Sequence, residues 1–182
     1  MKLRLILSLP LLALSLLAQD VRYNFSSGTN FERFKTYKWV QIKGADQPDQ
    51  LADQQIKSAI DAELSKKGLT KTVGDTPDLL VAYQVSLNQE KQTTMYDSGW
   101  GYGPGWGRYG YGYGGGITTA TTSTIQIGQL DLDIYDPGAK QLVWRGSASK
   151  TLDVKASPEK RQKNLAKGVA KLLKNFPPPK KG

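Results

Sequence analysis

The stretch that most constrains the fold runs from residue 98 to residue 116, where glycine occupies about every second position and most other residues are aromatic. Glycine loses more conformational freedom on folding than any other residue, so such a run is unsuited to a helix or strand in a core. The polar, strand-like segments 89–95 and 118–127 flank it. The sequence therefore predicts the tip of one long projecting hairpin, and not a linker between two domains.

The N-terminus has the pattern of a secretory signal peptide. A basic start at Lys2 precedes an apolar run over residues 5–18, and the polar Gln19 follows it. This arrangement is typical of a segment that is removed on export. We expect residues 1–18 to be a signal peptide that is cleaved after Ala18. The run is shorter than the roughly 20 residues that span a bilayer, so we expect a periplasmic or secreted protein with no transmembrane segment after cleavage.

Composition excludes several classes of chemistry. The 182 residues contain no cysteine and no histidine, which excludes disulfides, thiol nucleophiles, imidazole bases and nearly all structural zinc sites. Glycine loops that bind phosphate lie between a strand and a helix, and the glycine run has no such position. We therefore expect a protein that is not an enzyme and holds no cofactor, since catalysis would depend on carboxylates, hydroxyls or lysines alone.

Hydrophobic periodicity predicts both strands and helices. Apolar alternation predicts strands over residues 21–25, 36–42, 79–95, 118–135 and 142–148. Helical spacing predicts a first helix that Asp49 or Asp53 caps and that ends at Gly68 in the left-handed conformation. A second helix begins at Ser157 and its apolar stripe reaches Phe176.

The order of these elements, β-β-α-β-β-β-α, predicts an α+β fold. We expect a mainly antiparallel sheet of about five strands, with two helices on one face and the long hairpin projecting from it. Residues 19–176 then form a single domain that includes the tip at 98–116. Residues 177–182 form a tail rich in proline and lysine.

Positive charge is concentrated near the C-terminus of a chain whose formal net charge is +9. Lysines recur every three or four residues along the second predicted helix, nearly opposite its apolar stripe. They are Lys160, Lys163, Lys167, Lys171 and Lys174. Such a face attracts polyanions, and for an exported protein we expect anionic lipid or envelope polymers as partners and no nucleic acid. The alternative is the solvated face of an ordinary amphipathic helix.

The glycine-aromatic tip is a second candidate binding surface. In an extended segment alternate residues share one face, and aromatic rings there are able to stack on sugars or on a second copy of the chain. The candidates are Trp100, Tyr102, Trp106, Arg108, Tyr109, Tyr111 and Tyr113. The alternative is a low-complexity loop whose rings contact only the hairpin beneath them.

Asp131, Asp133 and Asp136 form the only tight cluster of acids in the sequence. Asp131 and Asp133 share a strand face, where two carboxylates are able to hold calcium or share a proton. The alternative is a solvated strand face beside a turn aspartate that caps its own backbone. Calcium needs six or more oxygen ligands, which a flat sheet face rarely supplies. We therefore favour that alternative and expect no metal site.

Two tryptophans and one glycine are expected to have structural roles. Trp39 and Trp144 lie inside strand patterns and belong in the core. Gly146 marks either the close approach of another backbone or a simple β-bulge.

Several segments together resemble a known bacterial family. They are Phe31–Trp39, Asp78–Tyr83, the glycine-aromatic insert, Gly128–Asp133, Leu142–Gly146 and Phe176–Pro178. In combination they resemble the domain-of-unknown-function family 4136, whose members are exported envelope proteins and often lipoproteins. The resemblance covers essentially the whole mature chain and implies envelope location and fold, without any catalytic residue. Gln19 stands where lipoprotein members carry cysteine.

Together these features predict an exported envelope protein that is a non-enzymatic binding or assembly module. Its expected partner is an envelope protein, a glycan or an anionic lipid, with self-association through the tip as a further option. One alternative is an accessory factor that binds anionic lipid or envelope polymers through the basic helix. Another is a hydrolase of wall polymers that uses Asp131 and Asp133.

Overall fold

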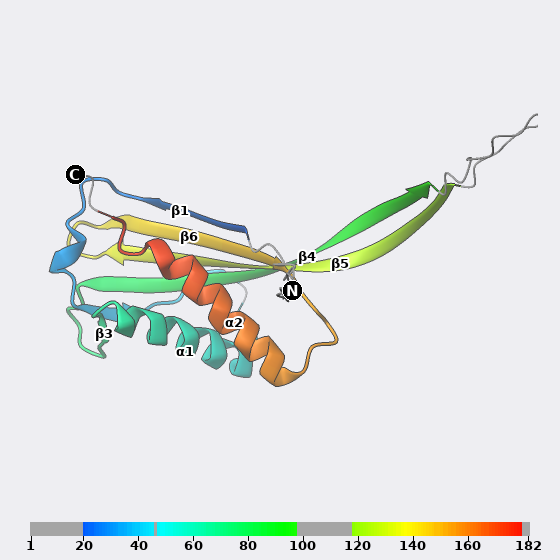
Figure 1. Ribbon diagram of the computed structural model, residues 1–182. Helices are drawn as coiled ribbons and strands as arrows, with labels where there is room; N and C mark the ends of the chain where they lie inside the picture. The colour runs from blue at the N-terminus through cyan, green and yellow to red at the C-terminus, as the bar shows by residue number, and fades with distance from the viewer. Residues whose placement is uncertain (1–19, 46, 98–117, 180–182) are drawn as a thin grey trace, which may run out of the picture.

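The protein has an α+β fold, with a six-stranded sheet and two α-helices packed on one of its faces (Figure 1). The computed structural model describes residues 20–45, 47–97 and 118–179. Its strands are β1 (Asp20–Phe25), β2 (Thr36–Trp39), β3 (Thr70–Lys71), β4 (Leu79–Asp97), β5 (Thr118–Asp136) and β6 (Gln141–Thr151). Its helices are α1 (Gln50–Lys66), α2 (Pro158–Leu172) and the short 3-10 turns η1 (Phe31–Arg33) and η2 (Leu173–Asn175).

The sheet has six strands and is mixed, where the sequence predicted about five strands in a mainly antiparallel sheet. Its strand order is β1-β6-β5-β4-β2-β3, and β2 runs parallel to both β3 and β4. Parallel neighbours need a crossover connection, and α1 supplies it between β2 and β4. β3 has two residues, too few for a periodic pattern. β2 ends at Trp39 and does not continue to Ile42 as expected.

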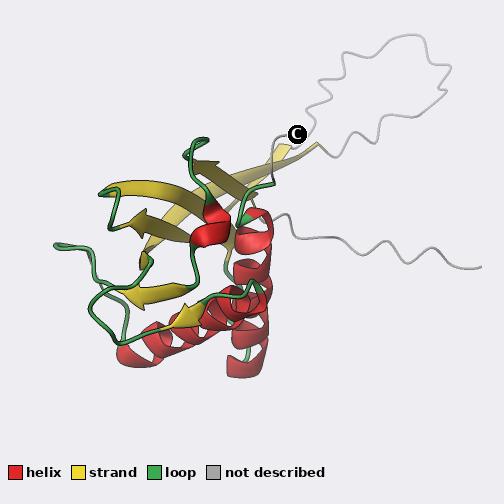
Figure 2. Cartoon of the chain, turned by 90° about the vertical axis from the view of Figure 1, so that its left-hand side faces the viewer, coloured by secondary structure: helices red, strands yellow, loops and turns green. Residues whose placement is uncertain are grey.

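The core lies between the sheet and the two helices (Figure 2). Directly paired residues of neighbouring strands share one face, so the apolar sets of β4, β5 and β6 point together toward the helices. The fully buried sheet residues include Leu79, Val81, Leu132, Ile134 and Trp144. From the helices, Ile60, Leu64, Val169 and Leu172 are fully buried against them. Trp39 packs against this cluster and is partly buried.

The residues that the sequence marked as caps fix the ends of both helices. Asp49 accepts a hydrogen bond from the N–H of Ala52 at 2.9 Å and is the N-cap of α1. Gly68 follows that helix with φ of +82°, the left-handed conformation. Ser157 caps α2 by accepting from the N–H of Lys160 at 3.3 Å. These contacts satisfy backbone groups that a helix end leaves unpaired.

Gly146 is a point of close approach, but an aromatic ring approaches it and not another backbone. A β-carbon at Gly146 would lie 2.3 Å from Trp144 Cη2 and 2.8 Å from Leu172 Cδ1. The irregularity in the β5–β6 ladder lies elsewhere, between Ile134 and Tyr135. The missing side chain of Gly146 therefore makes room for the buried indole ring, and the β-bulge explanation is wrong.

β4 and β5 continue beyond the sheet as a two-stranded ribbon (Figure 1). The last residue of β5 that pairs with β6 is Ile127, opposite Thr151. Beyond it, nine pairs from Gln89–Gln126 to Asp97–Thr118 join β4 and β5 alone. At about 3.3 Å per residue these pairs make an arm roughly 30 Å long. The predicted signal peptide and the tip at 98–116 lie outside the described residues.

Candidate functional site

The three clustered aspartates are engaged by other protein groups. Asp133 is only 3% exposed and accepts two hydrogen bonds of 2.5 Å from Arg145, one from Nε and one from Nη2. Asp136 is equally buried and pairs with Arg33, while its second oxygen accepts from two backbone N–H groups of the following turn. Asp131 accepts from Ser147 Oγ and Gln129 Nε2.

These contacts change the interpretation of the cluster. Asp133 and Asp136 do not lie on a solvated face, because both side chains are buried. An arginine compensates the charge of each buried carboxylate. Asp136 does cap its own turn, as the alternative had it. No group of three potential ligands able to hold a metal ion occurs within the described ranges. Both oxygens of Asp133 are occupied by Arg145, so this carboxylate is poorly placed for general acid–base work.

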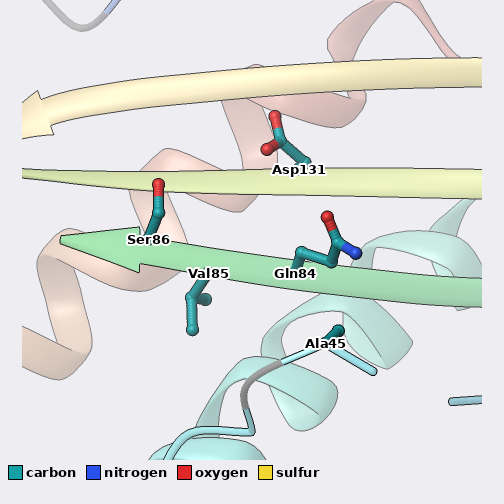
Figure 3. A pocket seen from close by; sticks show the side chains of 5 residues that line it. All are labelled: Ala45, Gln84, Val85, Ser86 and Asp131. Atoms are coloured by element: carbon teal, nitrogen blue, oxygen red, sulfur yellow. The ribbon is translucent and has the colours of Figure 1, made fainter. Parts of the chain in front are cut away.

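A small hollow of about 160 Å³ lies beside Asp131 on the sheet face opposite the helices. Figure 3 shows Gln84 and Ser86 of β4 and Asp131 of β5 on one side of the sheet, while Val85 between them points to the other side. Ala45, from the loop after β2, closes one wall. The hollow is polar, and its volume of about 160 Å³ lies below the roughly 300–1,000 Å³ of clefts that bind small molecules.

Tyrosines of the sheet bind acids of α1 and hold the two layers together. Tyr37 donates to Asp61 at 2.6 Å, and Tyr83 donates to Asp53 at 2.5 Å. Burial, with the neighbouring carboxylate, raises the pKa of both phenols well above the ordinary value. The hydrogen bond from Tyr83 lowers the pKa of Asp53. Both phenols therefore stay protonated as donors, and these bonds are structural.

The predicted lysine face of α2 is exposed along its whole length. Its members, Lys160, Lys163, Lys167 and Lys171 of α2 and Lys174 of the following turn η2, are all exposed. Lys160 pairs with Asp153 at 2.8 Å and lowers the pKa of that carboxyl. In the part of the chain that the structure describes, the other four lysines have no carboxylate partner within ion-pair distance. Opposite them, Val169 and Leu172 pack on the sheet.

The ribbon places its polar residues in solvent on both faces. Described side chains of its β4 half are exposed at Gln89, Glu90, Lys91 and Thr93, and those of its β5 half at Thr122, Ser123 and Thr124. Thr93 and Thr122 lie opposite one another with their hydroxyls 3.4 Å apart. The seven tip candidates, from Trp100 to Tyr113, lie outside the described residues, so the ribbon fixes only where their segment begins and ends.

Sequence reasoning missed a groove of about 530 Å³, called the α2 groove below. It lies between α2 and the helix-facing side of β4, β5 and β6, near the base of the ribbon. Its residues come from five elements, α1, α2, β4, β5 and β6, and from the loop 152–157, so no local motif marks it. One feature of the sequence could have indicated the groove. Leu152 and Val154 are apolar but lie outside any strand or helix pattern that would account for their burial.

Comparisons with known proteins bear on the fold. The model of a family described as a domain of unknown function, DUF4136, matches residues 21–178. No curated protein matches the chain. No helix within the described ranges is long and apolar enough to cross a membrane.

Two solved structures are similar to this chain. A PDZ domain protein from Parabacteroides distasonis is 19% identical with a TM-score of 0.56, over 90% of this chain and 37% of that protein. The chain therefore spans little more than a third of that protein. A PelC dodecamer from Paraburkholderia phytofirmans is 15% identical with a TM-score of 0.48, over 86% of this chain and 95% of the other. The first likeness shows a shared fold.

Proposed function

The chain belongs to the DUF4136 family, and we propose that this member is a non-enzymatic binding module of the bacterial cell envelope that presents its ribbon tip to a partner. The observation that carries the proposal is the ribbon, whose nine outer pairs are paired with no third strand among the described residues. The signal-peptide pattern of residues 1–18 supports export. The mature chain is then one domain over residues 19–176.

A contribution to the stability of the domain does not explain why the ribbon is present. A two-stranded ribbon with polar faces buries little apolar surface and is marginally stable by itself. It therefore adds little to the stability of the domain. In this proposal it serves to hold Asp97 and Thr118, between which the segment 98–117 begins and ends, roughly 30 Å from the sheet. That segment offers the rings of Trp100, Trp106 and the tyrosine run, which suit a glycan, an envelope protein or a second copy of the chain.

A hairpin shortened at its tip tests this proposal. Asp97 and Thr118 are directly paired, so replacing residues 98–117 with Asn-Gly closes the ribbon with a favoured two-residue turn. We expect the wild-type protein to retain an envelope component in pull-down from envelope extract, and the shortened protein to lose it. A second variant with serine at the tip's tryptophans and tyrosines keeps the length and should also lose it.

The controls separate binding from folding and from self-association. The shortened protein should melt within about 2 °C of the wild type, since a surface change shifts stability by about 0.5 kcal/mol or less. Sedimentation of the purified wild type shows whether the partner is another copy. Equal capture by the wild-type and shortened proteins would contradict the proposal.

Binding of anionic lipid or envelope polymers through α2 is a second candidate function. The observation that favours it is the row of exposed lysines, of which only Lys160 has an ion-pair partner among the described residues. A row of like charges attracts a polyanionic surface, and salt screens that attraction. Replacing all five lysines with glutamine should abolish binding to phosphatidylglycerol vesicles and leave pull-down by the tip intact. Vesicle binding that salt does not weaken would contradict this role.

We do not propose a hydrolase. The supporting pair would be Asp131 and Asp133, and Arg145 already binds both oxygens of the second. The segment in which Asp131 and Asp133 lie is instead part of a polar, hydrogen-bonded sheet face.

A further inference from the structure

The α2 groove has an apolar floor. Val85 of β4, Leu130 of β5 and Leu165 of α2 line it, and each is only partly buried although it packs against the core. Buried Ile56 and Val169 complete the floor. Apolar surface left in contact with water at the edge of a core favours a ligand that covers it.

Apolar side chains also stand at the mouth of the groove. Leu87 is 71% exposed and Val154 is 63% exposed. Leu152 lies over Gly128, where a β-carbon would be 3.0 Å from Leu152 Cδ2. The strand glycine therefore lets the loop after β6 come down on the sheet and form one wall. A ligand in the groove would remove more apolar surface from water than the floor alone provides.

The rim of the groove is cationic. Lys150, Lys160 and Arg161 line it, and Asp153 is the single carboxylate among the lining residues. Lys160 already binds Asp153 at 2.8 Å, and the N–H of Lys155 donates to the same carboxylate at 3.1 Å. Lys150 and Arg161 form no ion pair with any carboxylate in the described ranges. Two positive charges therefore remain available beside an apolar groove.

The size of the groove favours a hydrocarbon chain over a docked helix. One turn of an α-helix, about 5.4 Å of a cylinder 10–12 Å wide, occupies roughly 400–600 Å³. The groove, at about 530 Å³, thus holds about one turn, fewer than the two or more turns that supply the anchors of a docked helix. Its volume lies within the range of roughly 300–1,000 Å³ for small-molecule clefts. A hydrocarbon chain also brings no polar group that would need a partner there.

We propose that the α2 groove binds an amphiphile with one acyl chain and an anionic headgroup. The chain lies along Val85, Leu130 and Leu165, and the headgroup lies between Lys150 and Arg161. The site goes beyond the proposed function, because the ribbon tip takes no part in it. The one member of the lysine face that lines the groove, Lys160, is already paired with Asp153. Each methylene that enters the groove should tighten the dissociation constant about fourfold, which corresponds to about 0.8 kcal/mol.

Calorimetric titration of the purified protein with lysophosphatidylglycerol, below its micelle concentration, tests the proposal. We expect one saturable site whose affinity rises about fourfold per methylene until the chain fills the groove. Lysophosphatidylcholine of the same length, which has no net charge, should bind about tenfold more weakly, and glycerol phosphate should not bind measurably. Absence of saturable binding by lysophosphatidylglycerol would overturn the proposal.

A pair of variants on α2 tests the position of the headgroup. Arg161→Glu should weaken lysophosphatidylglycerol about tenfold, equivalent to about 1.4 kcal/mol, and leave lysophosphatidylcholine unchanged. Gln162→Glu adds a negative charge at the next residue of the same helix, which is exposed, lies outside the groove and is not part of the lysine face, and it should leave both affinities unchanged. Both acids lie in the first two turns of α2, where a negative charge is tolerated. Equal affinities of the two variants would place the headgroup elsewhere and overturn the assignment.

A second pair of variants tests the apolar mouth without disturbing the core. Leu87→Ser should weaken both lipids about fivefold, because the leucine would be covered by the bound chain. Val73→Ser removes a side chain that is 91% exposed and lies outside the groove, and should have no effect. Equal binding by these variants would also overturn the proposal.

Other occupants give distinguishable results. A dimer in sedimentation that Leu87→Ser dissociates would assign the groove to a second copy, and preferential binding of an acidic amphipathic peptide would assign it to a protein partner. Either result would overturn the proposal. The variant with a shortened ribbon should still bind the lipid. A failure of the lipid-binding proposal can therefore be distinguished from a failure of the proposal for the ribbon tip.

Discussion

Replacing Gly146 with alanine tests how tightly Trp144 is packed. The added β-carbon would lie 2.3 Å from Trp144 Cη2, 2.8 Å from Leu172 Cδ1 and 2.9 Å from Trp144 Cζ3. Carbon atoms in contact are normally about 3.5–4.0 Å apart. The indole ring must therefore move by more than 1 Å relative to the strand, while Trp144 and Leu172 are both fully buried.

The expected loss follows from the rigidity of that environment. Trp144 packs edge to face on Phe176, with ring centroids 5.4 Å apart, so its movement disturbs a second buried ring. Overpacking of a core by an added carbon destabilises by about 1–3 kcal/mol. Alanine in place of a strand glycine recovers about 0.4–1 kcal/mol through the unfolded state. We expect a net loss of about 1–2 kcal/mol, or a melting temperature lower by about 2–8 °C.

Gly128→Ala is the matched control, because Gly128 also lies in the middle of a strand in the same sheet. Its nearest neighbour would be Leu152 Cδ2 at 3.0 Å, at the far end of a side chain that is 39% exposed and free to turn away. We expect its free energy of unfolding to stay within about 0.5 kcal/mol of the wild type. Urea denaturation followed by circular dichroism and by tryptophan fluorescence measures both variants.

Two results would refute this reasoning. One is a Gly146→Ala protein as stable as the wild type, which would mean that Trp144 is not confined over the glycine. The other is an equal loss in both variants, which would mean that glycine is required in these strands for reasons unrelated to the indole ring.

Three further changes test separate contacts. Asp133→Asn weakens the bidentate pair with Arg145 and should lower the free energy of unfolding by about 1.5 kcal/mol in urea denaturation. Hydrogen bonds from two backbone N–H groups lower the pKa of Asp78, so its stabilising effect is present above the ordinary carboxyl pKa of about 3.9 and is lost as the pH falls through the lower folded-state value. Asp78→Asn should therefore flatten the decline of melting temperature below about pH 4. Gly68→Ala forces a side chain into the left-handed conformation at φ of +82° and should cost about 1 kcal/mol in thermal melts.

Local signals in the sequence predicted the helices well. Asp49 and Ser157 cap as expected, and Gly68 takes the left-handed conformation. These features depend on a few adjacent residues, so the sequence contains all the information that they need. The same holds for the lysine face of α2, whose exposure follows from helical spacing.

Pairing across the sheet was harder to predict because it joins residues far apart in the chain. The alternating pattern of β2 identifies a strand but does not say which strand lies beside it, or in which direction. Its parallel pairing with β4 follows from the crossover through α1. The two residues of β3 join the sheet because β2 leaves an edge free, and nothing local marks them.

The candidate sites, too, were predictable from the sequence only where they depend on residues close together in the chain. Alternation placed Asp131 and Asp133 on one face, but only the fold brings Arg145 and Arg33 to the buried carboxylates. The pattern therefore identified the acids and missed their counter-ions. The α2 groove had no signal in any single element, since it exists only where both helices, the loop after β6 and three strands come together.

The pairing of β1 with β6 also bears on when the protein folds. The first strand of the sheet is hydrogen-bonded to the last, with Asp20 opposite Ser149 and Phe25 opposite Trp144. Contacts between distant parts of a chain form slowly, since a long loop must close before they contribute. β1 cannot pair with a neighbouring strand until β6, the last strand of the sheet, is free to fold. Under the export that we propose, the chain would cross the membrane unfolded, and completion of the sheet would wait for β6 and follow translocation.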